Sequence, residues 1–151
     1  MLLLQTNPVA AALNSAEWIF PTAECFHLLG FGIAIGTIAL VDFSLLGFGF
    51  ARKATPQVQR DVAPWTLAAL LVVIMAGAVL FLTDPLHYYE NHSFRFKIVC
   101  LFLAIVFNYT IHRKVALSSE MSPVAKLIVG VVSLGLWGCV VVGGLFIAFL
   151  G

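Results

Sequence analysis

The chain has 151 residues, of which 62% are hydrophobic and only 10% are charged, and its formal net charge is +1. A soluble domain of this size needs a more strongly charged surface, so the composition excludes an ordinary soluble protein. The lack of a basic cluster gives no indication of a nucleic-acid partner, and none is expected. With a mean hydropathy of +1.05, the expected partner of most side chains is the lipid bilayer.

Four long apolar stretches account for most of the chain. A helix needs about 20 mainly apolar residues to cross a bilayer core roughly 30 Å thick. The sequence therefore predicts one all-α domain over residues 1–151, a bundle of four transmembrane helices with the approximate bounds 18–50, 64–83, 94–112 and 123–150. The residues up to Glu17 are expected to form a short interfacial segment.

Prolines mark the ends of the predicted spans. Pro123 opens the fourth span, where the missing N–H of proline costs little. Pro85 is expected to end the second span, because proline disfavours a helical conformation at the residue before it. The segment 84–93 is then predicted to be a polar loop. Its ionisable side chains include Asp84, His87, Glu90 and His92.

The basic residues predict the orientation of the spans, because cytoplasmic loops carry an excess of Lys and Arg. Six of these residues lie in or near the first and third loops, and two lie on the opposite side. We therefore expect both termini outside the cytoplasm. The six are Arg52, Lys53, Arg60, Arg113, Lys114 and Lys126, and the two are Arg95 and Lys97.

Ionisable residues inside the spans are costly, so each is a candidate for function. In the first span Glu24, His27 and Asp42 share one stripe at 100° per residue. In the third span Lys97, Asn108 and His112 do the same. Each stripe is expected to face the interior of the bundle.

Depth separates these polar residues into two layers, because the first and third spans run in the same direction. The two layers lie roughly 22 Å apart along the helices, at 1.5 Å per residue. The outer layer holds Glu24, His27, Asp84, His87, His92, Arg95 and Lys97, and the inner layer holds Asp42, Asn108 and His112.

A redox cofactor is the first hypothesis for these layers. The separation excludes His27 and His112 as the two ligands of one haem. In the outer layer, a b-type haem or another tetrapyrrole can take His27 as one axial ligand and a loop histidine as the other, with a basic side chain at its propionates. The candidate cofactor-binding residues are His27, His112, His87, His92, Arg95 and Lys97.

Two other hypotheses use the same residues. Glu24 and His27 stand at the i, i+3 spacing of carboxylate–histidine metal sites in helical bundles, with copper as the favoured metal. A proton or ion relay could instead run from the outer carboxylates to Asp42 and His112. Without any cofactor, the charges would hold helices together, Glu24 or Asp84 with Lys97 and Asp42 with Arg52 or His112.

The fourth span has no polar stripe, and its small residues point to helix packing. Gly135, Cys139 and Gly143 recur at a four-residue spacing, as Gly32 and Gly36 do in the first span. This pattern is typical of close contacts within the bundle, or with a second copy or a larger membrane complex through the fourth helix. No nucleophile triad, phosphate-binding loop or zinc-spaced cysteine pattern is present, which favours a non-enzymatic protein.

The motifs Glu24-x-x-His27-Leu-Leu-Gly30 and Val41-Asp42-x-x-Leu45-Leu46-Gly47 resemble an uncharacterised family of small bacterial four-span membrane proteins. The stretch from Phe81 to Lys97 and the pair Asn108 and His112 extend the resemblance over nearly the whole chain. The resemblance implies a four-helix bundle in a bacterial inner membrane, with periplasmic termini given the charge pattern. The build is similar to cytochrome b561-type and copper-resistance-type bundles. The family pattern includes His27 and His112 but neither loop histidine, which leaves a five-coordinate tetrapyrrole on His27.

Overall fold

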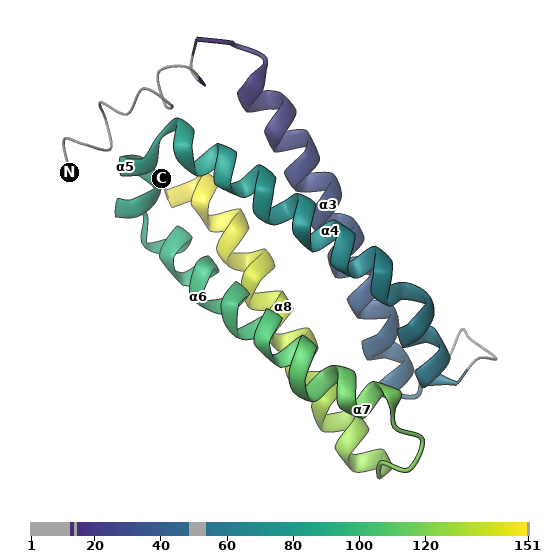
Figure 1. Ribbon diagram of the computed structural model, residues 1–151. Coiled ribbons are helices and arrows are strands. Elements are labelled where there is room, and N and C mark those ends of the chain that lie inside the picture. The colour runs from purple at the N-terminus through teal and green to yellow at the C-terminus, as the bar shows by residue number, and fades with distance from the viewer. Residues whose placement is uncertain (1–12, 14, 49–53, 151) are drawn as a thin grey trace.

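The computed structural model describes residues 13, 15–48 and 54–150 of the protein, and all of its regular structure there is helical. The four long helical segments are α3 (Ile19–Leu45), α4 (Thr55–Thr83), α6 (His92–Phe107) continued by the π-helical turn η1 (Asn108–His112) and by α7 (Arg113–Leu117), and α8 (Pro123–Leu150) (Figure 1). Each is long and apolar enough to cross a membrane. The predicted four-span, all-α fold is confirmed.

The helices pair as two hairpins. Helix α3 packs along α4, and α6 packs along α8, while contacts between α3 and α8 join the two hairpins. Helix α4 meets the second hairpin through α7 at one end of the bundle. The C-terminus of α8 lies beside α5 at the opposite end (Figure 1).

The second predicted span starts at the wrong residue, and the third is predicted to end too early. Helix α4 begins at Thr55, well before Pro64. Its first turn accepts Pro56, because the N–H that proline lacks has no partner at that position. Pro64 lies inside the helix, where proline usually costs a hydrogen bond. The third span begins at His92 and runs on to Leu117 without a break.

The first span ends earlier than residue 50, with a glycine-centred cap. Helix α3 stops at Leu45, and Gly47 adopts a φ of +80°, a conformation that glycine accepts readily. The amide of Phe48 donates to the carbonyl of Phe43, and that of Gly47 donates to Ser44, which is the Schellman arrangement for ending a helix. Arg52, Lys53 and most of the expected interfacial segment lie outside the described residues.

The predicted polar loop 84–93 is wrong, because most of it is helical. Helix α5 (Pro85–Glu90) starts where Oδ1 of Asp84 accepts from the amide of His87, with proline in the first turn. Helix α6 starts where Oδ1 of Asn91 accepts from the amide of Phe94 at 3.1 Å. Asp84 and Asn91 therefore act as N-caps of two successive helices.

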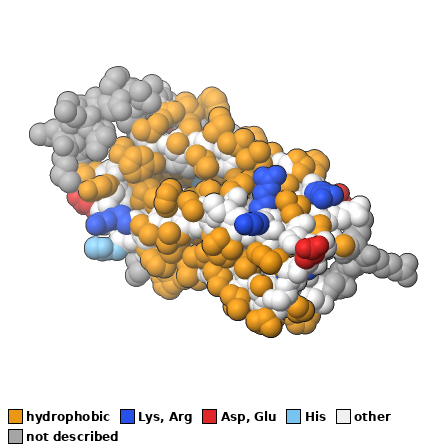
Figure 2. Space-filling model, turned by 60° about the horizontal axis from the view of Figure 1, so that its bottom comes forward, with side chains coloured by type: hydrophobic (Ala, Val, Ile, Leu, Met, Phe, Trp, Pro, Cys, Tyr) orange, Lys and Arg blue, Asp and Glu red, His pale blue; other side chains and the backbone are white. Residues whose placement is uncertain are grey.

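The apolar side chains face both inward and outward, as expected in lipid. One buried cluster crosses the middle of the bundle, and a second lies near the α7 end. Figure 2 shows a face dominated by hydrophobic side chains, with the charged ones in two separate groups. The middle cluster, called the apolar layer below, consists of Ala34, Ile38, Ala69, Leu70, Cys100, Ala104, Trp137 and Val140.

The glycine positions differ in what they face. A Cβ on Gly143 would lie 3.1 Å from the Phe96 ring, so this glycine does bring α8 close to α6. A Cβ on Gly32, Gly36 or Gly135 would meet nothing within 4 Å. The expected packing within the bundle is therefore wrong for these three, which face outward.

Candidate functional site

Two of the outer polar residues, His27 and Lys97, come together where the first part of α3 packs against the last part of α4. Nδ1 of His27 lies 2.9 Å from the carbonyl oxygen of Val73. A carbonyl only accepts, so Nδ1 carries the hydrogen and donates. Nε2 then keeps its lone pair, and none of the described residues bonds to it. A Cβ on Gly77 would lie 3.1 Å from Cε1 of this ring, so glycine is what lets the imidazole lie against α4.

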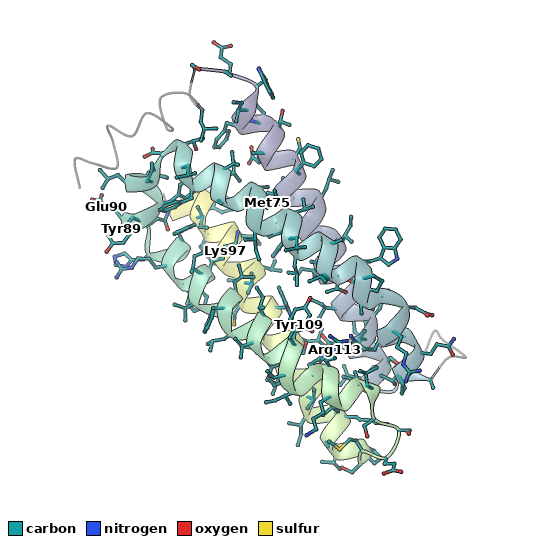
Figure 3. The ribbon with its side chains drawn as sticks, viewed as in Figure 1. Met75, Tyr89, Glu90, Lys97, Tyr109 and Arg113 are labelled. Atoms are coloured by element: carbon teal, nitrogen blue, oxygen red, sulfur yellow. The ribbon has the colours of Figure 1, made fainter. Side chains whose placement is uncertain are left out.

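Lys97 approaches the same place from α6. Its ammonium lies 5.6 Å from the centroid of the Phe31 ring, and that ring stacks with His27 at an interplanar angle of 6°. No carboxylate among the described residues pairs with this ammonium. The side chain of Lys97 passes beside Gly143 and Gly144 of α8, where its Nζ would be 3.4 Å from a Cβ on Gly144. Figure 3 shows Lys97 pointing from α6 into the bundle.

A pocket of about 400 Å³ opens beside these two side chains. Its walls come from α3, α4, α5, α6 and the end of α8, and they are mainly aliphatic and aromatic. The imidazole and the ammonium are its basic groups. We call this hollow the outer pocket; the side chains with rings or charge that line it are His27, Phe31, Phe81, Tyr88, Phe94 and Lys97.

The inner polar residues form a buried hydrogen-bond network that joins three helices. Nε2 of His112 in η1 lies 2.7 Å from Oδ1 of Asp42 in α3, and Oγ of Ser133 in α8 donates to Oδ2 of Asp42 at 2.9 Å. Asp42 and Ser133 are 0% exposed and His112 is 1% exposed. Both carboxylate oxygens therefore have donors, as a buried carboxylate requires.

This network is not a nucleophilic triad, although it holds the same three residue types. In a triad the histidine stands between the acid and the serine and takes the hydroxyl proton. Here Asp42 stands between His112 and Ser133, and the hydroxyl donates to the acid. Ser133 is therefore not activated by His112.

A second hollow, the inner cavity, lies beside this network and measures about 160 Å³. Helices α3 and α4 line one side of it, and η1 with the first residue of α7 lines the other. Tyr109 and Arg113 point from that side toward α4 (Figure 3). Its polar lining side chains are Gln59, Thr66, Asn108, Tyr109, His112 and Arg113.

A family model described as "Family of unknown function (DUF6644)" matches residues 17–150 of the chain. The chain belongs to this family. The resemblance predicted from the motifs is thereby confirmed, and DUF6644 is a family without an assigned activity. Neither a curated protein nor a solved structure matches the chain.

The other predicted site residues of this DUF6644 protein lie away from the outer pocket. His87, His92, Glu24 and Asp84 are exposed. His92 lines a separate shallow hollow with Phe96 and α8 residues, and His87 sits edge-on to the ring of Tyr88. The guanidinium of Arg95 lies over the Tyr89 ring at 6.0 Å. These five predicted site residues do not line the outer pocket: His87, His92, Glu24, Asp84 and Arg95.

Tyr88 links the outer pocket to the end of the bundle. Burial raises the pKa of its phenol above the usual value, and the nearby carboxylates of Glu24 and Asp84 raise it further. The phenol is therefore held neutral, as a hydrogen-bond donor at the outer mouth of the pocket.

The apolar layer separates the outer pocket from the inner cavity on all four long helices. In α3 it holds Ala34 and Ile38, which come between His27 and Asp42. In α8 it holds Trp137 and Val140, beyond Ser133. The two polar levels of this DUF6644 protein are thus distinct sites, joined by no chain of described polar side chains through the layer.

Three features were not anticipated from the sequence. Ser133 lies in the span without a polar stripe, yet it shares a buried face with Gly130 and Trp137 at spacings of three and four residues. Gln59 falls in a segment predicted to be a loop. The carbonyl of Val73 is a backbone group, so no residue type marks it.

Proposed function

We propose that this DUF6644 protein binds haem b or another tetrapyrrole in the outer pocket, with His27 as the axial ligand. Its role would be electron transfer or that of an accessory subunit in a membrane complex. One observation carries the proposal. His27 donates from Nδ1 to the Val73 carbonyl and leaves Nε2 without a protein partner beside an apolar pocket.

That arrangement is what a ligating imidazole needs. Histidines that bind metals usually donate their other ring N–H to a carbonyl or carboxylate, which fixes the tautomer and the ring orientation. A histidine that only packs would also need a partner for its N–H. What favours a ligand role for His27 is its other nitrogen, which has no partner among the described residues and lies beside the outer pocket.

The walls of the outer pocket suit the remainder of a tetrapyrrole. Cofactor sites are largely apolar hollows of some hundreds of Å³ with a few placed polar groups. Phe31, Phe81 and Phe94 offer flat apolar surfaces, and the unpaired ammonium of Lys97 can meet a propionate. Bound haem would supply one-electron chemistry, with its potential set by the axial ligand and by burial.

The proposed coordination is one-sided. His87 in α5 and His92 at the start of α6 lie outside the outer pocket, and His112 lies beyond the apolar layer. His27 is thus the one histidine that lines the pocket. This agrees with a five-coordinate tetrapyrrole rather than with two axial histidines.

The alternative roles find less support. Among the described residues no three His, Cys, Asp or Glu side chains gather as a metal site, so copper would rest on His27 with an exposed Glu24. A proton or ion path from one side of the membrane to the other would have to cross the apolar layer. Both alternatives predict that Glu24→Gln or Asp42→Asn abolishes transport into liposomes, and a cofactor role predicts no transport in wild type.

The setting that goes with this function is an inner bacterial membrane, with periplasmic termini and the α7 end in the cytoplasm. Reporter domains fused to the C-terminus test the orientation, since a periplasmic reporter should be active there and a cytoplasmic one inactive. We also propose that α8 contacts a second copy of the chain or another subunit. Light scattering of the purified protein tests the contact with a second copy, and a monomeric mass would count against it.

An absorption spectrum of protein purified without stripping its cofactors tests the central proposal. We expect a Soret band in wild type and in His92→Ala, and its loss in His27→Ala. Lys97→Gln should keep a weakened band. A wild-type spectrum without a Soret band, on a preparation supplied with haem during expression, would overturn the tetrapyrrole.

A further inference from the structure

The inner cavity gathers polar side chains that have no protein partner. Gln59 and Asn108 are 9% and 7% exposed, and no hydrogen bond joins either side-chain amide to a described residue. His112 also lines the cavity, and its Nδ1 is a buried side-chain atom without a hydrogen-bond partner. Buried polar groups are nearly always paired, because an unpaired one costs the lost hydration. One such nitrogen, beside a hollow lined by two amides and a guanidinium, indicates a ligand.

The charges around the cavity point to the sign of that ligand. None of the described side chains that line it is acidic, and Arg113 brings a guanidinium to it. Asp42 lies behind His112, with both oxygens occupied by His112 and Ser133. Its carboxylate is therefore engaged away from the cavity.

The side chains that line the inner cavity also offer hydrogen-bond donors, and none of them is a group that can only accept. The guanidinium of Arg113 only donates, and each amide of Gln59 and Asn108 offers an NH₂ group. Nε2 of His112 donates to Asp42, and a second proton on Nδ1 would make that buried nitrogen a further donor beside the cavity. The pair Asp42 and His112 is then neutral, and Arg113 supplies the charge that attracts an anion.

We propose that the inner cavity is a binding site for a small monovalent anion, of the size of chloride or formate. The anion would accept hydrogen bonds from Arg113, Asn108 and Gln59 and complete the bonding of His112. Ions of this size fit a hollow of about 160 Å³. This site is separate from the proposed tetrapyrrole site, because the apolar layer lies between them.

The thermal unfolding midpoint of the purified protein in detergent tests this proposal. Sodium chloride or sodium formate is titrated against sodium gluconate at constant ionic strength, because gluconate is too large for the cavity. A ligand that binds only the folded state raises the midpoint in a saturable way. We expect saturation with chloride and formate and none with gluconate.

Matched variants test whether the rise of the midpoint comes from an anion bound in the inner cavity. Arg113→Gln should weaken the apparent affinity about tenfold or more, because it removes a charge-assisted hydrogen bond. Lys114→Gln removes the same charge from the neighbouring residue, which does not line the cavity, and should leave the affinity within about twofold. Asn108→Leu should abolish the saturable rise while its midpoint in gluconate shows that the variant folds.

Two outcomes would overturn the anion site. If chloride and formate raise the midpoint no more than gluconate does, the cavity holds water only. If Arg113→Gln and Lys114→Gln lose affinity equally, the anion binds to the general basic charge of that end. Neither outcome alters the visible spectrum, so the test of the tetrapyrrole stands apart from this one.

Discussion

Nε2 of His112 lies 2.7 Å from Oδ1 of Asp42, and this contact joins the third membrane span to the first at a point where neither side chain meets solvent. The two residues are 70 positions apart in the chain. Their contact, together with Ser133, is the only hydrogen-bond network of side chains that joins three of the described long helices.

Removing one partner of this pair should destabilise the bundle strongly. In Asp42→Ala the imidazole loses its acceptor and Ser133 loses its own, and breaking a buried pair costs about 3–5 kcal/mol. Unfolding by SDS in mixed micelles measures the loss. Glu120→Gln, an exposed acid in the loop before α8, should change stability by less than about 0.5 kcal/mol.

The pairing itself is tested by a double-mutant cycle, which also works if Asp42→Ala does not fold. Asp42→Asn and His112→Gln keep hydrogen-bonding groups of similar size. If the two side chains interact, the double variant should be more stable than the sum of the single losses predicts, by about 1 kcal/mol or more. Additive losses would mean that the contact contributes no coupling.

The hydroxyl of Ser133 should contribute as one hydrogen bond to a buried carboxylate. Ser133→Ala leaves Oδ2 of Asp42 without its donor, and we expect a loss of about 1.5–3 kcal/mol. Ser119→Ala changes an exposed serine in the loop before α8 and should have almost no effect. If the two variants are equally stable in the same unfolding assay, the hydroxyl of Ser133 does not contribute to the network.

Gly77 should be intolerant of alanine because of His27. The added Cβ would come within 3.1 Å of Cε1 and 3.3 Å of Nδ1 of the imidazole, which would push the ring off the Val73 carbonyl. We expect Gly77→Ala to lower stability by about 1–3 kcal/mol and to reduce the Soret band of the proposed haem protein.

Gly36→Ala is the matched control, since a Cβ there meets nothing within 4 Å. Alanine is the better helix former by about 1 kcal/mol, so this variant should be as stable as wild type or more so. If the two variants change stability in the same direction and by the same amount, His27 does not pack on Gly77.

Tyr88 should ionise at a higher pH than a free tyrosine does. Its pKa is raised by burial and then by the carboxylates of Glu24 and Asp84, so the folded protein holds the proton more tightly than the unfolded chain. The stability that follows is fully present below the unfolded value of about 10 and is lost as the pH climbs through the folded value. Tyrosinate absorbance follows the titration.

In that titration Tyr88→Phe should remove a late phase, and that phase should stay in Tyr89→Phe, which changes the exposed neighbouring tyrosine. Loss of the same phase in both variants would contradict the inward position of Tyr88.

The fold was predictable because lipid imposes a strong pattern on sequence. Four runs of about 20 apolar residues have few alternatives to spanning helices. The stripe in the first span indicated the inward position of His27 and Asp42 correctly, but Glu24 on the same stripe is exposed. The pairing of Asp42 with His112 was one of two options for that acid, and the structure adopts it. The helix bounds were harder, since Pro64 lies inside α4 rather than at its start.

The sites were less predictable, because several of their parts carry no distinctive residue type. The anchor of His27 is a backbone carbonyl, and a single serine among aliphatic residues, such as Ser133, does not form a stripe. Helix α5 did carry a signal, since Asp84-Pro85 is a typical N-cap followed by a first-turn proline. That pair was interpreted only as the end of the preceding helix.

The apolar layer of Ala34, Ile38, Ala69, Leu70, Cys100, Ala104, Trp137 and Val140 also has an electrical consequence. An energised membrane drops its voltage across the medium of lowest polarity, and one elementary charge gains about 2.3 kcal/mol per 100 mV. The outer pocket and the inner cavity lie on opposite sides of this layer, so part of that voltage would fall between them. A charge taken up at one of them would be sensed by the other as a change in field.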